Sequence, residues 1–104
     1  MGKEQTTHDR KVRQLSRELK KKGYNVKADI GGYERPEPIG KYGYRPDIIA
    51  TKRGVMKIIE VETPKSLTAD REQRKAFIKS VAQRKRANFD IVVTKPREVR
   101  RKRD

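Results

Sequence analysis

The chain has 104 residues, so we expect one domain and no room for a second core. Because 32% of the residues are hydrophobic and 41% are charged, we expect the core to be thin. The absence of cysteine excludes a disulfide framework and a thiolate metal site. The formal net charge of +15 indicates a polyanionic partner. We favour nucleic acid over the charged surface of a thermophile, because ion-pair networks need acids and bases in similar numbers. No apolar run is long enough for a membrane span or a signal-peptide core, so we expect a soluble cytoplasmic protein without membrane contacts.

The first predicted elements are a helix over residues 6–22 and a strand over residues 24–30. Thr6 and Asp9 have capping-box spacing, and Gly23 is a natural helix stop. Apolar side chains at helical spacing form one stripe of the helix, and basic residues occupy the opposite face. In the strand, apolar and polar residues alternate, which is typical of a half-buried strand.

A loop and two further strands follow. Residues 31–45 hold four glycines, two prolines and three tyrosines, which predicts a long loop or a distorted hairpin. Long loops in small domains are often functional. Short apolar runs predict strands over residues 48–51 and 55–61, and Gly54 marks the turn between them. The second of these strands is apolar on both faces, so we expect it at the centre of the sheet.

The last predicted elements are a helix over residues 68–86 and a strand over residues 89–94. The order is therefore α-β-β-β-α-β, which indicates a single small α/β domain with a mixed sheet flanked by helices. We expect residues 1–94 to form this domain. Residues 95–104 are mostly basic and have no core-forming pattern, so we expect a flexible tail there.

Three acidic residues stand at the ends of the two middle strands. Strand alternation places Glu60 and Glu62 on one face. If the turn at Gly54 pairs the strands antiparallel, Asp47 comes to lie opposite them, and three carboxylates converge at one edge of the sheet. Their repulsion is costly unless a cation neutralises it, and hard oxygen ligands suit magnesium or manganese. Taken singly, each acid is more simply explained as a solvent-exposed strand end.

The pattern Pro46-Asp47 followed by Glu60-x-Glu62, within the predicted order of elements, resembles the PD-(D/E)xK nuclease superfamily with the restriction-endonuclease-like fold. It is most similar to the small members, the archaeal Holliday-junction resolvases and the RecB-type nuclease domains. The resemblance implies an endonuclease that hydrolyses phosphodiester bonds of DNA with magnesium or manganese. It implies Asp47, Glu60 and the carbonyl of Val61 as metal ligands.

One position departs from the superfamily pattern. The third motif residue is usually Lys, which orients or activates the attacking water, and here it is Glu62. A minority of restriction enzymes with this fold carry Glu there, so an active nuclease is the first interpretation. A catalytically inactive nucleic-acid-binding module with the same fold is the alternative. A basic accessory protein without any site, whose acids pair with Arg, is a third.

Two further residues are candidates for the site by analogy with the superfamily. Gln73 and Phe77 have a spacing similar to the Gln-x-x-x-Tyr motif of RecB-like nucleases, although a polar residue tolerated at a helix start is an equally good interpretation. Lys75 is the other residue of that helix that could replace the missing Lys. His8 lies near the start of the first helix, where related nucleases place Glu or His beside the metal, but a packing histidine is the favoured interpretation.

Basic residues outside the acidic cluster are expected to contact phosphates without reading the base sequence. They are Lys65, Arg71, Arg74, Lys75, Arg97, Arg100 and Arg101. The tyrosines of the 31–45 loop could stack on unpaired bases or pack the loop onto the domain. The expected partner is double-stranded or branched DNA, and the sequence leaves open whether two copies act as a homodimer.

Overall fold

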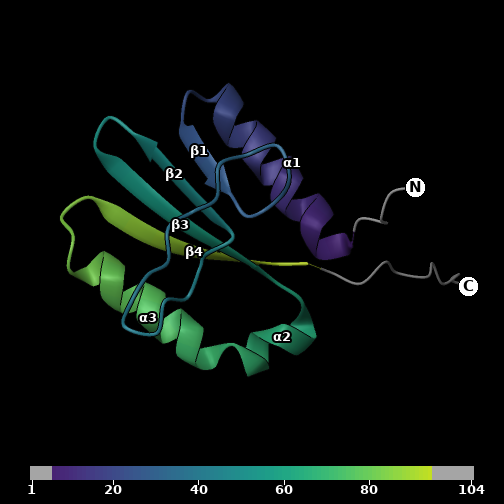
Figure 1. Ribbon diagram of the computed structural model, residues 1–104, viewed down its shortest axis with the longest axis vertical. Coiled ribbons are helices and arrows are strands. Elements are labelled where there is room, and N and C mark those ends of the chain that lie inside the picture. Colours follow the sequence, from purple (N-terminus) through teal and green to yellow (C-terminus); the bar gives the residue numbers. More distant parts are fainter. Residues whose placement is uncertain (1–5, 95–104) are drawn as a thin grey trace, which may run out of the picture.

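A computed structural model of the chain describes residues 6–94. Within this range the elements are α1 (Thr7–Lys21), β1 (Asn25–Ala28), β2 (Ile48–Lys52), β3 (Val55–Glu62), α2 (Pro64–Ala69), α3 (Arg71–Ala82) and β4 (Ala87–Val93) (Figure 1). The predicted α/β order is confirmed, with one additional short helix, α2, before the second long helix. None of the helices in the described range combines the length and the apolar character needed to cross a membrane.

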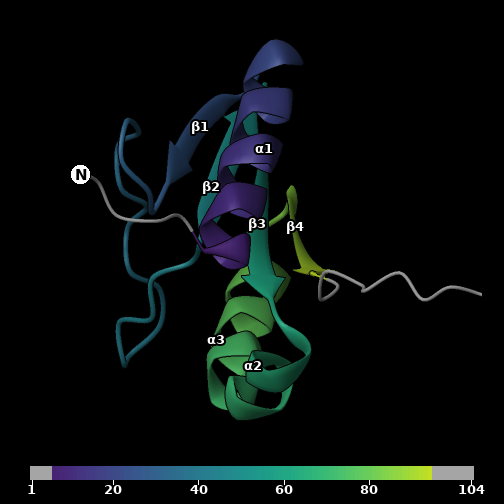
Figure 2. The same ribbon diagram turned by 90° about the vertical axis from the view of Figure 1, so that its right-hand side faces the viewer.

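The four strands form one mixed sheet in the order β1-β2-β3-β4. β1, β2 and β3 are antiparallel neighbours, whereas β4 runs parallel to β3. A parallel neighbour requires a crossover connection, and α2 and α3 provide it. α1 covers one face of the sheet and α3 covers the other (Figure 1 and Figure 2).

Each face of the sheet has its own apolar core. On the α1 face, Val12 belongs to a buried cluster with Ile59 and Val61. On the α3 face, Phe77 is fully buried and belongs to a cluster with Ile58. Because β3 buries side chains on both faces, its predicted central position is confirmed.

Local sequence signals set the two ends of α1. The hydroxyl of Thr6 accepts a hydrogen bond from the backbone N–H of Asp9 (3.0 Å), which satisfies one of the free donors of the first turn. Gly23 follows the helix with a φ of +93°, a conformation that glycine adopts without steric cost. The helix therefore begins and ends within one residue of its predicted limits.

A tight turn sets the register of β2 against β3. Arg53 and Gly54 both have positive φ angles, 49° and 81°, as a type I′ hairpin turn requires. This register pairs the first residues of β2 with the end of the apolar part of β3. Asp47, immediately before β2, therefore lies beside Glu60.

Two strands, β1 and β4, differ by two residues from a predicted limit, whereas β2 and β3 differ by one. β1 ends at Ala28 because the chain turns away there, and the backbone N–H of Asp29 donates to the carbonyl of Asp47 (2.9 Å). This hydrogen bond closes the long loop at its base. β4 begins at Ala87, where it already pairs with Met56, so it starts earlier than the predicted strand.

The segment after β3 corrects the prediction of one helix over residues 68–86. It forms two helices, α2 and α3, which Asp70 separates, and α3 ends at Ala82. Thr63 caps α2 in a reciprocal capping box with Ser66, and a proline occupies its first turn. The cap and the proline therefore begin a helix in a segment between the predicted strand and the predicted helix.

Candidate active site

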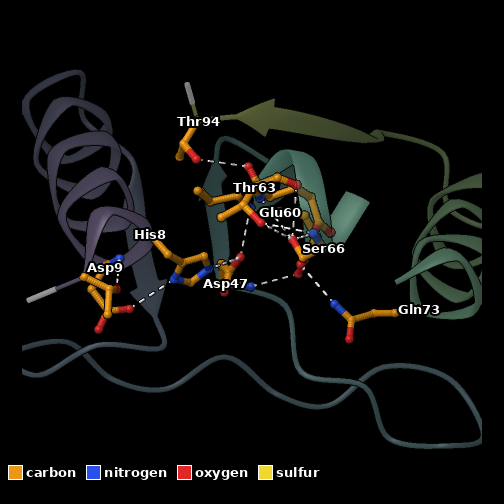
Figure 3. Close-up of polar contacts among 11 residues, drawn as sticks. His8, Asp9, Asp47, Glu60, Thr63, Ser66, Gln73 and Thr94 are labelled. Carbon is orange, nitrogen blue, oxygen red and sulfur yellow. Dashed lines mark hydrogen bonds and ion pairs between the residues drawn. The ribbon is translucent and has the colours of Figure 1, made fainter. Parts of the chain in front are cut away.

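Asp47 and Glu60 contact each other across the antiparallel pair of β2 and β3 (Figure 3). The backbone N–H of Asp47 donates to Glu60 Oε2 (3.1 Å), and the backbone N–H of Val61 donates to Asp47 Oδ2 (2.8 Å). Each carboxyl group is thus held by a backbone donor of the opposite chain segment. The structure brings these two acids together at the sheet edge where antiparallel pairing predicts them.

Glu60 is buried and carries a strongly perturbed carboxyl group. Its exposed fraction is 3%. Burial raises the pKa of Glu60 from 4.5 to about 9, and the charge of Asp47 acts in the same direction. The hydrogen bond from the backbone of Asp47 lowers the pKa but does not offset these two effects. Without a cation beside it, Glu60 is therefore protonated at neutral pH.

Glu62 lies on the same face of β3 but makes a different contact. The Ser66 hydroxyl donates to Glu62 Oε1 (2.6 Å), whereas the buried Glu62 Oε2 has no hydrogen-bond partner among the described side chains and backbone. Burial raises the pKa of Glu62, the Ser66 hydrogen bond lowers it, and the charge of Asp70 raises it further. The sequence analysis missed Ser66 and Asp70 at this site. The Thr63-x-x-Ser66 capping spacing was the signal that could have placed Ser66 there.

Gln73 joins the site from α3. Its Nε2 donates to Glu60 Oε1 (3.0 Å), so both oxygens of Glu60 have a partner (Figure 3). Gln73 and Glu60 come from different elements, and the crossover connection brings them together. The geometry favours a residue of the site over a polar residue merely tolerated at a helix start.

His8 reaches the site from α1. Its Nε2 lies 3.2 Å from Asp47 Oδ2, and its Nδ1 lies 3.0 Å from Asp9 Oδ1 (Figure 3). The hydrogen bond to Asp47 raises the pKa of His8 to about 9, against the opposing effect of burial. An imidazolium can donate from both nitrogens, so it matches two carboxylate partners. The structure therefore places the His8 side chain, 35% exposed, beside Asp47, with a hydrogen bond from each ring nitrogen to an acid.

Comparison with known proteins identifies the family. The family model described as REase_AHJR-like matches residues 1–102. The chain belongs to this restriction-endonuclease-like family. No curated protein matches the sequence. The resemblance inferred from Asp47, Glu60 and Glu62 is therefore confirmed for the family, as is the predicted fold.

The acidic site of this AHJR-like domain has the donor chemistry for a hard divalent cation. Asp47, Glu60 and Glu62 offer carboxylate oxygens, and no described residue is a hydrogen-bond partner of the buried Glu62 Oε2. As these side chains stand, no three His, Cys, Asp or Glu residues among residues 6–94 form a group that could hold a metal. Backbone hydrogen bonds link Asp47 and Glu60, whereas Glu62 accepts from Ser66. The residue types fit a cation, and a cation would favour the ionised form of each buried carboxyl group.

The basic residues predicted to meet phosphates occupy different positions in the AHJR-like domain. Arg71 and Lys75 are exposed on α3, where Lys75 also pairs with Glu72 (3.7 Å). Arg74 is half-buried, and its guanidinium donates to the carbonyl of Leu67 in α2. Arg74 therefore ties α3 to α2, in addition to any contact with a phosphate.

The other residues predicted to contact phosphates lie in α2 or outside the described residues. Lys65 lies in α2, three residues after Glu62, where β3 ends. Arg97, Arg100 and Arg101 lie outside the described residues. The predicted tail of residues 95–104 lies outside them as well.

Proposed function

We propose that this chain is a metal-dependent DNA endonuclease whose site is built on Asp47 and Glu60. The observation that carries the proposal is the reciprocal pair of backbone hydrogen bonds that holds these two acids side by side. They lie at the end of a buried central strand, where charge repulsion and burial are unfavourable and a divalent cation offsets both. Membership of a restriction-endonuclease-like family supports a nuclease-type function.

Several residues of the chain would share the work of binding and orientation. Magnesium or manganese would be held by Asp47, Glu60 and the carbonyl of Val61, and would supply Lewis-acid polarisation of the scissile phosphate. Gln73 fixes the Glu60 side chain through Oε1. The His8 imidazolium fixes Asp47 through Oδ2, so both acidic ligands have a positioning residue.

Glu62 is the candidate for the residue that handles the attacking water. Its Oε2 has no partner within the described part of the chain, and burial raises its pKa, so its carboxylate is a stronger base than that of an exposed Glu. In the proposed reaction, Glu62 accepts a proton from the water while the water oxygen bonds to phosphorus. The bond from phosphorus to the leaving oxygen then breaks, and the leaving oxygen takes a proton from solvent. Ser66 orients the carboxylate by donating to its other oxygen.

The DNA would be bound by the basic residues that surround this acidic site. Arg71 and Lys75 present exposed positive charge on α3, and the net charge of the chain is +15. Contacts of this kind go mainly to phosphates, so affinity should fall steeply with salt and depend weakly on base sequence.

The test is a cleavage assay with the full chain on a labelled linear duplex, a single strand and a four-way junction. We expect cleavage with magnesium or manganese, and none by Asp47→Ala, because that change removes a proposed metal ligand. Asp47→Ala should still bind DNA in EDTA, since the basic surface supplies this binding. Glu34→Gln is the matched control, because it changes a carboxyl group that is 75% exposed and outside the site.

One observation favours a second candidate, a nucleic-acid-binding module that has lost catalysis. The acids of the described residues do not form a ready three-residue metal group, and Glu62 replaces the usual Lys. Titration with manganese separates the candidates, since the module should show weak binding or none. If the parent chain cleaves no DNA with either ion, and neither ion raises its melting temperature, the binding module replaces the enzyme.

A further inference from the structure

The long loop between β1 and β2 ends in a small fixed hairpin. Ile39 and Tyr44 form an isolated antiparallel bridge, with N–O distances of 2.7 and 3.0 Å. The backbone N–H of Gly43 donates to the carbonyl of Gly40 (3.1 Å), which closes the turn between them. Ile39 and Tyr44 also pack against the buried cluster that contains Phe77. The hairpin is therefore anchored at its base by backbone and by core contacts.

This hairpin lies against α3. The loop extends from the sheet to α3 and returns to β2 (Figure 1 and Figure 2). Gly40 has a φ of +81°, and a Cβ added there would lie 3.3 Å from the Cβ of Ala76. Any larger residue at position 40 would therefore combine backbone strain with a tight contact. Glycine at 40 and alanine at 76 allow the close approach of loop and helix.

A groove of about 650 Å³ runs between the hairpin and α3. Among the described residues, four basic side chains and one acidic side chain line this groove. The basic residues are Lys41, Lys75, Lys79 and Arg84, and the acid is Glu72. Glu72 pairs with Lys75, which leaves the other basic residues without an acid among the groove-lining residues. The groove is thus a positively charged channel.

At the mouth of this groove, Tyr42 presents an open aromatic ring. Tyr42 is 73% exposed, although the turn that carries it is fixed. Its ring lies 6.1 Å from the ring of Tyr44 at an angle of 58°, and Lys41 Nζ lies 5.3 Å from its centroid. Core packing does not account for this ring, because most of its surface faces solvent. An exposed ring beside basic side chains matches the stacking platforms that bind unpaired bases.

We propose that the groove binds an unpaired stretch of nucleic-acid strand, with one base stacked on Tyr42 and phosphates on the basic residues of α3. The inference rests on the proposed function, because it assigns the path of the strand next to the acidic site. Gln73, which contacts Glu60, and Lys79 are six positions apart in α3, about 9 Å of helix rise. A strand that leaves the acidic site along α3 therefore enters the groove within a few nucleotides. The substrate class is DNA with an unpaired segment next to the scissile bond.

Binding of a fluorescently labelled oligothymidylate and of a duplex of equal length is measured by anisotropy with the full chain in EDTA. Tyr42→Ala should weaken binding of the oligothymidylate about tenfold, and binding of the duplex by less than about twofold. Tyr42→Phe keeps the ring and should bind like the parent. Thermal unfolding of Tyr42→Ala should match that of the parent, because the ring is mostly exposed.

Two lysines provide a control for charge alone. Lys79→Gln in the groove should weaken oligothymidylate binding more than Lys21→Gln, which removes an exposed charge from the last turn of α1. A single strand with 2-aminopurine should lose fluorescence on binding to the parent and keep it on binding to Tyr42→Ala, since stacking quenches this base.

Four results would overturn the inference. Equal losses for single strand and duplex in Tyr42→Ala, or no loss for either, would show that the ring does not stack on an unpaired base. Equal losses in the two lysine variants would show that only net charge matters. Competition by polyglutamate as strong as by unlabelled oligothymidylate would assign the groove to an acidic peptide. Because the assay contains no divalent ion, it measures strand binding independently of cleavage. A chain without nuclease activity can therefore still show the expected binding, and an active nuclease can lack it.

Discussion

Replacing Glu60 by Gln tests whether the acidic site is held in a protonated state until a cation arrives. Glutamine has nearly the shape of a protonated glutamic acid. Its oxygen can accept from the backbone N–H of Asp47, and its amide can donate to Gln73 once the Gln73 amide turns. The substitution therefore removes the ionisable group and retains both hydrogen bonds.

The pKa of Glu60 determines whether Glu60→Gln raises or lowers the stability of the folded chain. Burial raises this pKa from 4.5 to about 9, so between these values the folded chain keeps a proton that the unfolded chain releases. The parent chain consequently loses stability as the pH rises through this window, whereas Glu60→Gln does not. At about 1.4 kcal/mol for each pH unit, the parent has lost about 3 kcal/mol by pH 7 relative to the variant. For a domain of this size, this corresponds to a difference in melting temperature on the order of 10 °C.

The measurement is thermal unfolding in EDTA, followed by circular dichroism, for the parent and Glu60→Gln at a series of pH values. We expect the parent and Glu60→Gln to have equal melting temperatures at about pH 4. The melting temperature of Glu60→Gln should then exceed that of the parent by a margin that grows toward about pH 8. Manganese should reverse the order, because it stabilises the ionised carboxylate of the parent and has no such ligand in Glu60→Gln. Glu34→Gln is the control and should follow the parent at every pH. A constant difference between parent and Glu60→Gln across the pH range would refute the buried, protonated state of Glu60.

Two further predictions concern catalysis and binding. Glu62→Gln should lower the cleavage rate with little change in the melting temperature. Glu62→Lys, which restores the usual residue, should retain more activity than Glu62→Ala. Equal rates for all three variants would exclude a role of Glu62 in the reaction. A chain that ends at Thr94 should bind DNA less tightly with a shallower salt dependence, measured by anisotropy at several salt concentrations. An unchanged salt dependence would mean that the basic tail does not contact the DNA.

Most of the fold follows from local signals in the sequence. Thr6 and Gly23 mark the ends of α1 because a cap and a left-handed glycine satisfy the free groups of the helix ends without any distant partner. The turn at Gly54 fixes the β2–β3 register in the same way. The second helix was predicted less well, because residues 62–67 were assigned to no element and the cap at Thr63 was overlooked.

The sequence by itself determined which residue types meet at the sheet edge. Antiparallel pairing across a two-residue turn leaves Asp47 no other place than beside Glu60, and alternation then puts Glu62 on the same face. These are consequences of strand geometry, which depends on neighbouring residues only. The same geometry accounts for the resemblance to a nuclease family.

Only the tertiary structure decided which partner each of these side chains takes. His8 is 39 residues from Asp47 in sequence, and α1 must pack on the sheet before they meet. The crossover through α3 likewise brings Gln73 to Glu60, and the capping box of α2 places Ser66 where its hydroxyl donates to Glu62. A side chain chooses among hydrogen-bond partners according to distances of a few ångströms, and these distances are set when separate elements pack together. Residue types and spacing predict which groups are available, and packing determines which of them bind each other.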